Sequence, residues 1–359
     1  MGRVSGSGAG LADHGALSAA IETALAGAGV PALSAGTQRL MAAYRSGESP
    51  ARPVLTTRKD AAAYAAYRMP ATAAAAVRAL QETRLSLPGW TPATLLDFGA
   101  GTGSMAWAAA VQLPSLMAVT LLEQSAEAMG LGRSILAATD LPALRTATWR
   151  FWRLPDSDRT PDRDGGLSAD LATASYVLGE LTQPQQAALV ALAAMAAPVV
   201  VLVEPGTPAG YHRILAAREQ LLGAGYLLAA PCPHDLRCPL EAVGDWCHFG
   251  ARLPRSGLHR QVKGAELGYE DEKFSYVAAL RPEVLGQPGR PAGRIVRRPE
   301  QRKGLVTLEL CRSDGSASGE LIGKSAGQTY RLARKLSWGA RFEASPWGGG
   351  DRDSRPDQT

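Results

Sequence analysis

Three of the four cysteines of this chain lie within one short stretch. Cys232, Cys238 and Cys247 occur within residues 231–249, and Cys311 follows far downstream at the end of an apolar run. A proline directly follows Cys232 and Cys238, which predicts a stiff, non-helical loop. Thiolates on such a loop are ligands for zinc or for an iron–sulfur cluster. The stretch therefore predicts a metal or cluster site.

The spacing of the cysteines helps to separate the possible metals. A structural zinc site usually carries Cys-x2–4-Cys pairs, whereas five, eight and 63 residues separate the successive cysteines here. This wide spacing favours an iron–sulfur cluster bound by all four thiolates. Zinc, with His234 and His248 as substitute ligands, remains the alternative. Four buried thiols without any ligand are the third possibility.

A glycine-rich stretch marks a second candidate site. Gly99, Gly101 and Gly103 follow a predicted strand at 95–98, and Asp97 lies two residues before the first glycine. Glycine lets the backbone turn sharply and come close to a ligand. A turn of this kind between a strand and a helix is typical of nucleotide-cofactor sites.

The acidic residues indicate which cofactor would fit. Glu123 lies 20 residues after Gly103, at the end of the next predicted strand, where a carboxylate can hold a ribose diol. A dinucleotide site needs a third glycine where Ser104 stands, and Asp97 would repel a pyrophosphate. The pattern instead resembles motif I of class I S-adenosylmethionine (SAM) methyltransferases, in which the acidic residue faces the cationic end of the cofactor. A dinucleotide site and a tight turn without a ligand are the alternatives.

No catalytic residue is predicted. Amino-methylating enzymes of this fold often carry an Asn- or Asp-Pro-Pro-aromatic motif after the fourth strand, but residues 174–180 read ASYVLGE. No cysteine stands where a pyrimidine-methylating nucleophile would be expected. The sequence thus favours SAM binding over methyl transfer.

Alternating strands and helices must position the glycine loop. Apolar segments at 95–98, 118–122, 145–152, 170–177 and 199–203 are separated by helical patterns. This alternation predicts an α/β fold with a doubly wound parallel sheet, of the class I SAM-methyltransferase type. Two later strands are expected at 274–280 and 305–310, with an exposed basic loop at 281–303 between them.

The domain boundaries follow from shifts in composition. We expect disorder in 1–12, a helical N-terminal region in 13–90, and a disordered tail in 343–359. A SAM-methyltransferase-like domain should occupy 91–342, with a polar loop at 156–166 and a cysteine-rich insertion at 229–263. Cys311 would end the last predicted strand, so that a cluster would tie the insertion to the edge of the sheet.

The chain carries a net charge of +5, with 38 basic and 33 acidic residues. Such a balance predicts a phosphate-bearing partner, although a genome of high GC content, which favours Arg and Ala, would explain the composition equally. Three basic segments would form an RNA-facing surface: Arg252, Arg255, Arg260 and Lys263; Arg290, Arg294, Arg297, Arg298, Arg302 and Lys303; and Arg331, Arg334, Lys335 and Arg341, beside Trp338.

The sequence also predicts where the protein resides. It has no run of about 18 apolar residues, so no membrane span is expected. The first residues resemble neither a secretory signal nor a mitochondrial transit peptide. We therefore expect a cytoplasmic bacterial protein, and a monomer.

Four stretches carry a family resemblance. Residues 202–208, 230–239, 245–249 and 269–276 resemble the methyltransferase-like assembly factors of the mitochondrial small ribosomal subunit and their bacterial homologues. The resemblance extends over about 64–339. It implies a SAM-methyltransferase fold and association with small-subunit rRNA and the pre-ribosomal small subunit. It also implies a [4Fe–4S] cluster on Cys232, Cys238, Cys247 and Cys311.

Three functional hypotheses follow. The first is an rRNA-binding factor of small-subunit assembly that carries the cluster and is catalytically inactive or only weakly active. The second is an active SAM-dependent rRNA methyltransferase. The third is an iron–sulfur sensor that couples ribosome assembly to iron or redox state.

Overall fold

A computed structural model describes residues 9–45, 55, 57–154, 166–264 and 266–343. Almost all of the predicted polar loop at 156–166 lies outside the described residues, as do residues 1–8 and 344–359 of the predicted disordered ends. The chain divides into two compact units. Unit 1 comprises residues 1–231 and 246–289, and unit 2 comprises 232–245 and 290–359.

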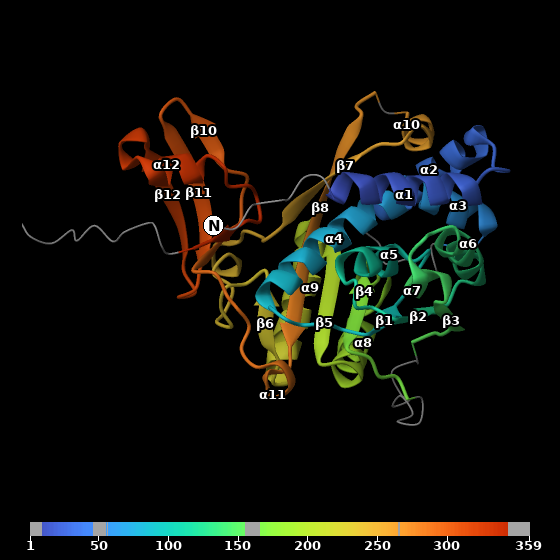
Figure 1. The fold of residues 1–359 in the computed structure, drawn as a ribbon, viewed down its shortest axis with the longest axis horizontal. Coiled ribbons are helices and arrows are strands. Elements are labelled where there is room, and N and C mark those ends of the chain that lie inside the picture. Colours follow the sequence, from blue (N-terminus) through green and yellow to red (C-terminus); the bar gives the residue numbers. More distant parts are fainter. Residues whose placement is uncertain (1–8, 46–54, 56, 155–165, 265, 344–359) are drawn as a thin grey trace, which may run out of the picture. The chain divides into compact units, whose positions relative to one another are not determined.

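Unit 1 is built on an eight-stranded sheet. The strand order is β3-β2-β1-β4-β5-β8-β6, with β7 paired to β8 (Figure 1). The strands are β1 (Thr94–Phe98), β2 (Ala118–Glu123), β3 (Thr148–Phe151), β4 (Leu171–Ser175), β5 (Val199–Pro205), β6 (Leu227–Ala230), β7 (Phe249–Pro254) and β8 (Tyr269–Leu280). Strands β1 to β5 pair in parallel, whereas β8 is antiparallel to β5, β6 and β7. This order and the antiparallel β8 give the class I SAM-methyltransferase-like fold, so the predicted fold class is confirmed. The expected parallel sheet is in fact mixed, because β8 is antiparallel to its neighbours.

The burial and register of the central strands show where a ligand would bind. Residues 199–204 of β5 are all buried, as a strand covered by helices on both faces requires. Asp97 of β1 is aligned with Leu121 of β2 on one side and with Thr173 of β4 on the other. The carboxyl ends of β1 and β4 therefore meet where the strand order reverses, which is the usual ligand position in open α/β sheets.

Helices cover the sheet and precede it. Those of unit 1 are α1 (Ala9–Ala24), α2 (Val30–Arg45), α3 (Arg58–Tyr67), α4 (Met69–Ser86), α5 (Ser104–Gln112), α6 (Ala126–Ala137), α7 (Pro142–Arg145), η2 (Leu178–Glu180), α8 (Gln183–Ala196), α9 (Pro208–Gly223), α10 (Gly257–Lys263) and α11 (Pro282–Leu285). The side chain of Thr57 caps α3 by accepting the Asp60 N–H, and Thr207 caps α9 in the same way. The predicted helical N-terminal region corresponds to α1–α4, and α1 starts within the segment expected to be disordered. In the described part of the chain, no helix has the length and hydropathy that a bilayer crossing needs.

Unit 2 is a small β structure. Its five-stranded sheet has the order β10-β11-β9-β13, with β12 paired to β11. Its elements are η3 (Glu241–Val243), β9 (Gly293–Ile295), β10 (Glu300–Arg302), β11 (Leu305–Arg312), β12 (Ala317–Gly323), η4 (Lys324–Ala326), α12 (Gln328–Ala333) and β13 (Arg341–Phe342). Ile295, Val306, Leu308, Leu310 and Phe342 form its core with Ile322 and Ala333.

Unit 2 departs from three sequence predictions. The segment 281–303 is not one exposed loop, because it forms α11, β9 and β10. Cys311 does not end the last strand, because β12 and β13 follow β11. It also lies in the sheet of unit 2 rather than at the edge of the larger sheet. Residues 91–342 contain parts of both units.

Candidate functional site

The glycine loop has the conformation that its sequence predicts. Gly99, Gly101 and Gly103 have φ values of +65°, +57° and +93°, a region that other residues rarely adopt. A Cβ at Gly99 would lie 2.5 Å from Val177 Cγ2, so glycine is required there for packing. A Cβ at Gly101 would meet no atom of the described residues within 4 Å, so these residues leave open space beside the loop. Such space is what a loop that receives a ligand needs.

Asp97 lies at the base of this loop and is 1% exposed. Its Oδ1 accepts a hydrogen bond of 2.7 Å from Thr173 Oγ1. Its Oδ2 is buried and has no hydrogen-bond partner among the described residues. Burial, together with the charge of Glu123, raises the pKa of Asp97 to about 7, although the hydrogen bond from Thr173 opposes the shift. A buried carboxylate oxygen with no partner could take a hydrogen bond from a cationic ligand.

Glu123 holds the glycine loop in place. Its Oε2 accepts the N–H of Gly101 at 2.8 Å, and its Oε1 accepts the N–H groups of Gln124 and Ser125, both at 2.8 Å. The carboxylate thus anchors the turn after β1 to the turn after β2. Its predicted contact with a ribose would have to use the remaining acceptor positions of the same oxygens.

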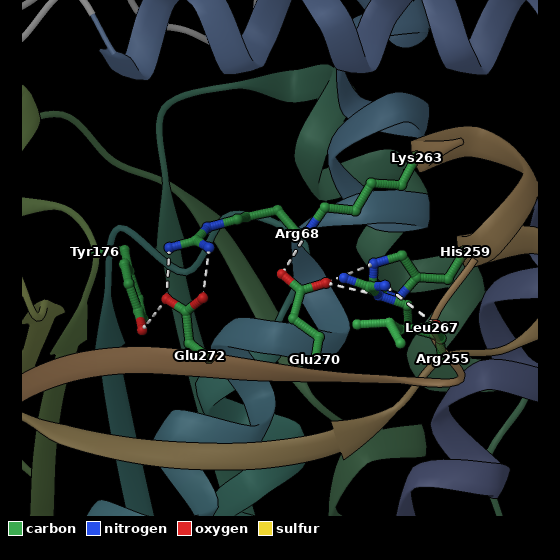
Figure 2. A network of polar contacts seen from close by, with 8 residues as sticks. All are labelled: Arg68, Tyr176, Arg255, His259, Lys263, Leu267, Glu270 and Glu272. Carbon is green, nitrogen blue, oxygen red and sulfur yellow. Dashed lines mark hydrogen bonds and ion pairs between the residues drawn. The ribbon is translucent and has the colours of Figure 1, made fainter. Parts of the chain in front are cut away.

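An ionic contact lies beside the carboxyl end of β4. Glu272 of β8 accepts two hydrogen bonds of 2.8 Å from the Arg68 guanidinium and one of 2.9 Å from the Tyr176 hydroxyl. Figure 2 shows Glu272 between these two side chains. The guanidinium also lies 4.9 Å from the centre of the Tyr176 ring. Tyr176 directly follows β4 and has a φ of +57°, which marks it as a strained residue at a ligand-binding edge.

More carboxylates border the same edge. Glu204, at the end of β5, accepts a hydrogen bond of 2.7 Å from Arg213 and one of 3.0 Å from the Leu178 N–H. Burial raises the pKa of Glu180 to about 8, and the charges of Glu123 and Glu204 add to the effect. The carboxyl edge of the sheet is therefore acidic and closely packed.

A second ionic contact is formed by Glu270, which lies two residues before Glu272 on β8. Glu270 contacts Lys263 Nζ at 2.5 Å, Arg255 Nε at 3.1 Å and His259 Nε2 at 3.4 Å (Figure 2). We call these four residues the Glu270 cluster. Although burial opposes it, the contacts with His259 and Lys263 lower the pKa of Glu270 well below its usual range. Two of the cations predicted to face RNA are thus neutralised within the protein.

Other predicted RNA contacts are also used internally. Arg252 forms two hydrogen bonds of 2.7 Å with Asp271, and Arg290 contacts Asp235 at 2.6 Å. Arg297 is paired with Asp245. Arg294 is buried and donates to the Gly339 carbonyl at 2.9 Å. These four arginines support the fold of their own units.

The cysteines divide between the two units. Cys232, Cys238 and Cys311 belong to unit 2, and Cys247 belongs to unit 1. In unit 2, Cys311 Sγ lies 3.4 Å from His234 Nε2, so the loop that carries Cys232 reaches β11. Within the described ranges, no group of three or more His, Cys, Asp or Glu side chains is arranged to hold a metal ion. The donor types nevertheless suit an iron–sulfur cluster, since all four are cysteines.

The residues of the ionic contact at Glu272 are not predicted from the sequence as a site. Tyr176 and Glu272 were not predicted, although Glu270 and Glu272 alternate on a strand and so share one face. That alternation, in a stretch otherwise apolar on its inner face, was the available signal.

Comparisons with known proteins place this geometry in context. A family model described as "Mitochondrial small ribosomal subunit Rsm22" matches residues 58–343. The human protein "Ribosome assembly protein METTL17, mitochondrial" is 30% identical over 295 residues, which cover 77% of this chain and 61% of that protein. The Schizosaccharomyces pombe protein "Rsm22-cox11 tandem protein 2, mitochondrial" is 26% identical over 187 residues, 40% of this chain and 24% of that protein. The matches thus span less than two thirds of these relatives.

Two solved structures are similar to this chain at low identity. Magnesium protoporphyrin IX methyltransferase from Synechocystis PCC 6803, solved with bound SAM, is 13% identical with a TM-score of 0.35, covering 66% of this chain and 89% of that one. Precorrin-6y C5,15-methyltransferase from Geobacter metallireducens is 15% identical with a TM-score of 0.35, covering 57% and 86%. Neither likeness transfers a substrate to this chain.

One prediction is overturned by these comparisons. The expectation of a bacterial cytoplasmic protein is contradicted, because the matched family and both curated relatives are named as mitochondrial. That expectation rested only on the composition of the first residues, of which 1–8 lie outside the described part of the chain.

Proposed function

The chain belongs to the Rsm22 family, and on that premise we propose that it is a methyltransferase-like factor of small-subunit assembly that binds rRNA. The observation that carries this proposal is the family match over 58–343, joined to the strand order of a class I methyltransferase-like sheet. The relatives are named for ribosome assembly and for the mitochondrial small ribosomal subunit. In an assembly factor, a methyltransferase fold can serve as a binding scaffold.

The ionic contact beside the end of β4 favours binding over methyl transfer. A methyl acceptor would have to approach the ligand across the carboxyl ends of β1 and β4. Arg68 and the Tyr176 hydroxyl, next to the end of β4, are both hydrogen-bonded to Glu272. An acceptor that displaced Arg68 would leave the buried Glu272 carboxylate without its counter-charge, which is unfavourable.

We propose SAM as the ligand of the glycine loop, held by Asp97, Gly99, Gly101, Gly103 and Glu123. The partnerless oxygen of Asp97 and the open space at Gly101 support a cationic ligand at this place. Bound SAM would supply an electrophilic methyl group. Asp97 would accept a hydrogen bond from its amino group, and Glu123 would fix the loop.

Calorimetry with SAM tests the binding. We expect binding to the full chain that Asp97→Asn weakens by at least tenfold, because that variant removes the buried negative charge. A methylation assay on immature small subunits then separates the two functions. Methyl transfer to rRNA by the wild type, abolished by Asp97→Asn, would favour the active methyltransferase instead.

We further propose that Cys232, Cys238, Cys247 and Cys311 hold a [4Fe–4S] cluster. Support comes from the donor types and from the contact between His234 and Cys311, which places the cysteine loop against β11. The cluster would contribute to the folding of unit 2, because ligand binding by thiolates adds directly to stability.

Anaerobic purification tests this site. We expect about four iron atoms per chain and absorption near 400 nm, both lost in Cys311→Ser. One zinc per chain and no iron would overturn the assignment.

A further inference from the structure

Six of the exposed cations of unit 2 lie on segments that are joined by hydrogen bonds. They stand at the end of β10, in the turn to β11, at the start of η4, in α12 and in the two residues after α12. We call them the basic edge: Arg302, Lys303, Lys324, Arg331, Arg334 and Lys335. All six are exposed.

Backbone contacts hold these segments together. The Lys324 N–H donates to the Gly304 carbonyl at 2.8 Å, which joins η4 to the turn that carries Lys303. Gln301 of β10 donates to the Arg334 carbonyl at 2.9 Å, which joins the strand to the end of α12. The pairing of Leu305 with Gly323 fixes β11 and β12 at the same point. The charges are therefore presented by a rigid surface rather than by a loose tail.

The basic edge has few internal counter-charges. Lys303, Lys324, Arg331, Arg334 and Lys335 have no carboxylate partner among the residues that the structure describes. Arg302 is 3.7 Å from Glu300, and both side chains are more than 60% exposed, so the contact is weak. Like charges held close together without partners raise the local potential and attract polyanions.

We propose that the basic edge is the surface through which the chain binds the phosphate backbone of rRNA. This inference rests on the proposed function and locates it in unit 2. Three of the six residues are lysines, which are depleted in protein interfaces but common in phosphate contacts. An RNA backbone therefore fits this surface better than a protein partner.

Charge neutralisation tests the proposal. The test variant is Lys303→Gln, Lys324→Gln, Arg334→Gln and Lys335→Gln together. The matched control changes four exposed cations of unit 1, which have no carboxylate partner among the described residues: Lys59→Gln, Arg145→Gln, Arg260→Gln and Lys273→Gln. Both remove four charges from the full chain. Thermal unfolding of each confirms that the fold is kept.

Binding to a transcribed small-subunit rRNA is measured at several salt concentrations. We expect the test variant to lose roughly 100-fold in affinity at 0.1 M salt, and its salt slope to flatten by about three. The control should lose less than about threefold. Equal losses in both variants, or an unchanged test variant, would overturn the proposal.

Two outcomes separate this inference from the proposed function. If the wild type does not bind the rRNA at any salt concentration, the proposed function fails. If wild type and test variant bind rRNA equally while polyglutamate binds only the wild type, the basic edge serves an acidic protein partner. In that case, rRNA binding stands and its location in unit 2 is wrong.

Discussion

The Glu270 cluster and the basic edge are both rich in basic residues, yet they use their charge in opposite ways. In unit 1, Arg255 and Lys263 are largely buried and share one carboxylate. In unit 2, Lys303 and Arg334 are exposed, with no acidic partner among the described residues. The comparison teaches that a basic segment binds an external phosphate only if the fold leaves its charges unpaired.

The largest expected effect is a dependence of stability on pH, and it extends the comparison to two carboxylates. Glu270 has cations around it, whereas Asp97 contacts none of the described residues' cations, and their pKa values move in opposite directions. Because folding raises the pKa of Asp97 from 3.8 to about 7, the folded state holds a proton that the unfolded state has lost. Between those values, the free energy of unfolding of unit 1 should fall as the pH rises, by up to roughly 4 kcal/mol.

Urea unfolding at pH 5 and pH 8, followed by tryptophan fluorescence, should show roughly 3 kcal/mol of this fall, because the folded-state pKa lies about two units above pH 5. Asp97→Asn removes the titrating group, so its stability should depend less on pH than that of the wild type. The contradicting result is a wild type that gains stability between pH 5 and pH 8, with the same dependence on pH in Asp97→Asn. That result would show that Asp97 is charged in the folded state.

The next largest effect is expected when a substitution removes the carboxylate of the Glu270 cluster. Glu270→Gln leaves Arg255 and Lys263 largely buried without their counter-charge, which should lower the free energy of unfolding by roughly 3 kcal/mol. Asp271→Asn is the matched control on the neighbouring residue, since its partner Arg252 is solvent-exposed and stays hydrated. Urea unfolding should therefore distinguish the two variants. Equal stabilities would mean that the cluster contributes no more than a surface pair.

The smallest effect concerns a single residue of the basic edge. Arg334→Gln should leave stability nearly unchanged and reduce the slope of log affinity for rRNA against log salt by about one. Arg260→Gln, an exposed cation of unit 1, provides the control and should keep the wild-type slope. If the salt slope changes for Arg260→Gln but not for Arg334→Gln, the exposed cations of unit 1, rather than those of unit 2, contact the RNA.

Local patterns in the sequence predicted much of unit 1. The strand before Gly99, the glycine turn and helix α5 each follow from neighbouring residues, and the structure has all three. The predicted strand at 145–152 proved shorter, because residues 142–145 form α7. The alternation of strands and helices sufficed for the fold class but not for the antiparallel strand β8.

Local sequence patterns could not predict the long-range contacts. Tyr176 and Glu272 are 96 residues apart, so their hydrogen bond has no local signal. Strands β9 and β10 have three residues each, too few to show a period. Arg294 appeared to belong to an exposed basic segment, yet the fold buries it in β9. The distinction between paired and unpaired arginines therefore required the structure.

Crosslinking of RNA to the tagged full chain in cells that express it, followed by sequencing, tests the central claim most directly. We predict that small-subunit rRNA dominates the crosslinked fragments and that neutralising Lys303, Lys324, Arg334 and Lys335 removes them. Crosslinks spread over messenger and transfer RNA, or absent altogether, would contradict a role in small-subunit assembly through rRNA binding.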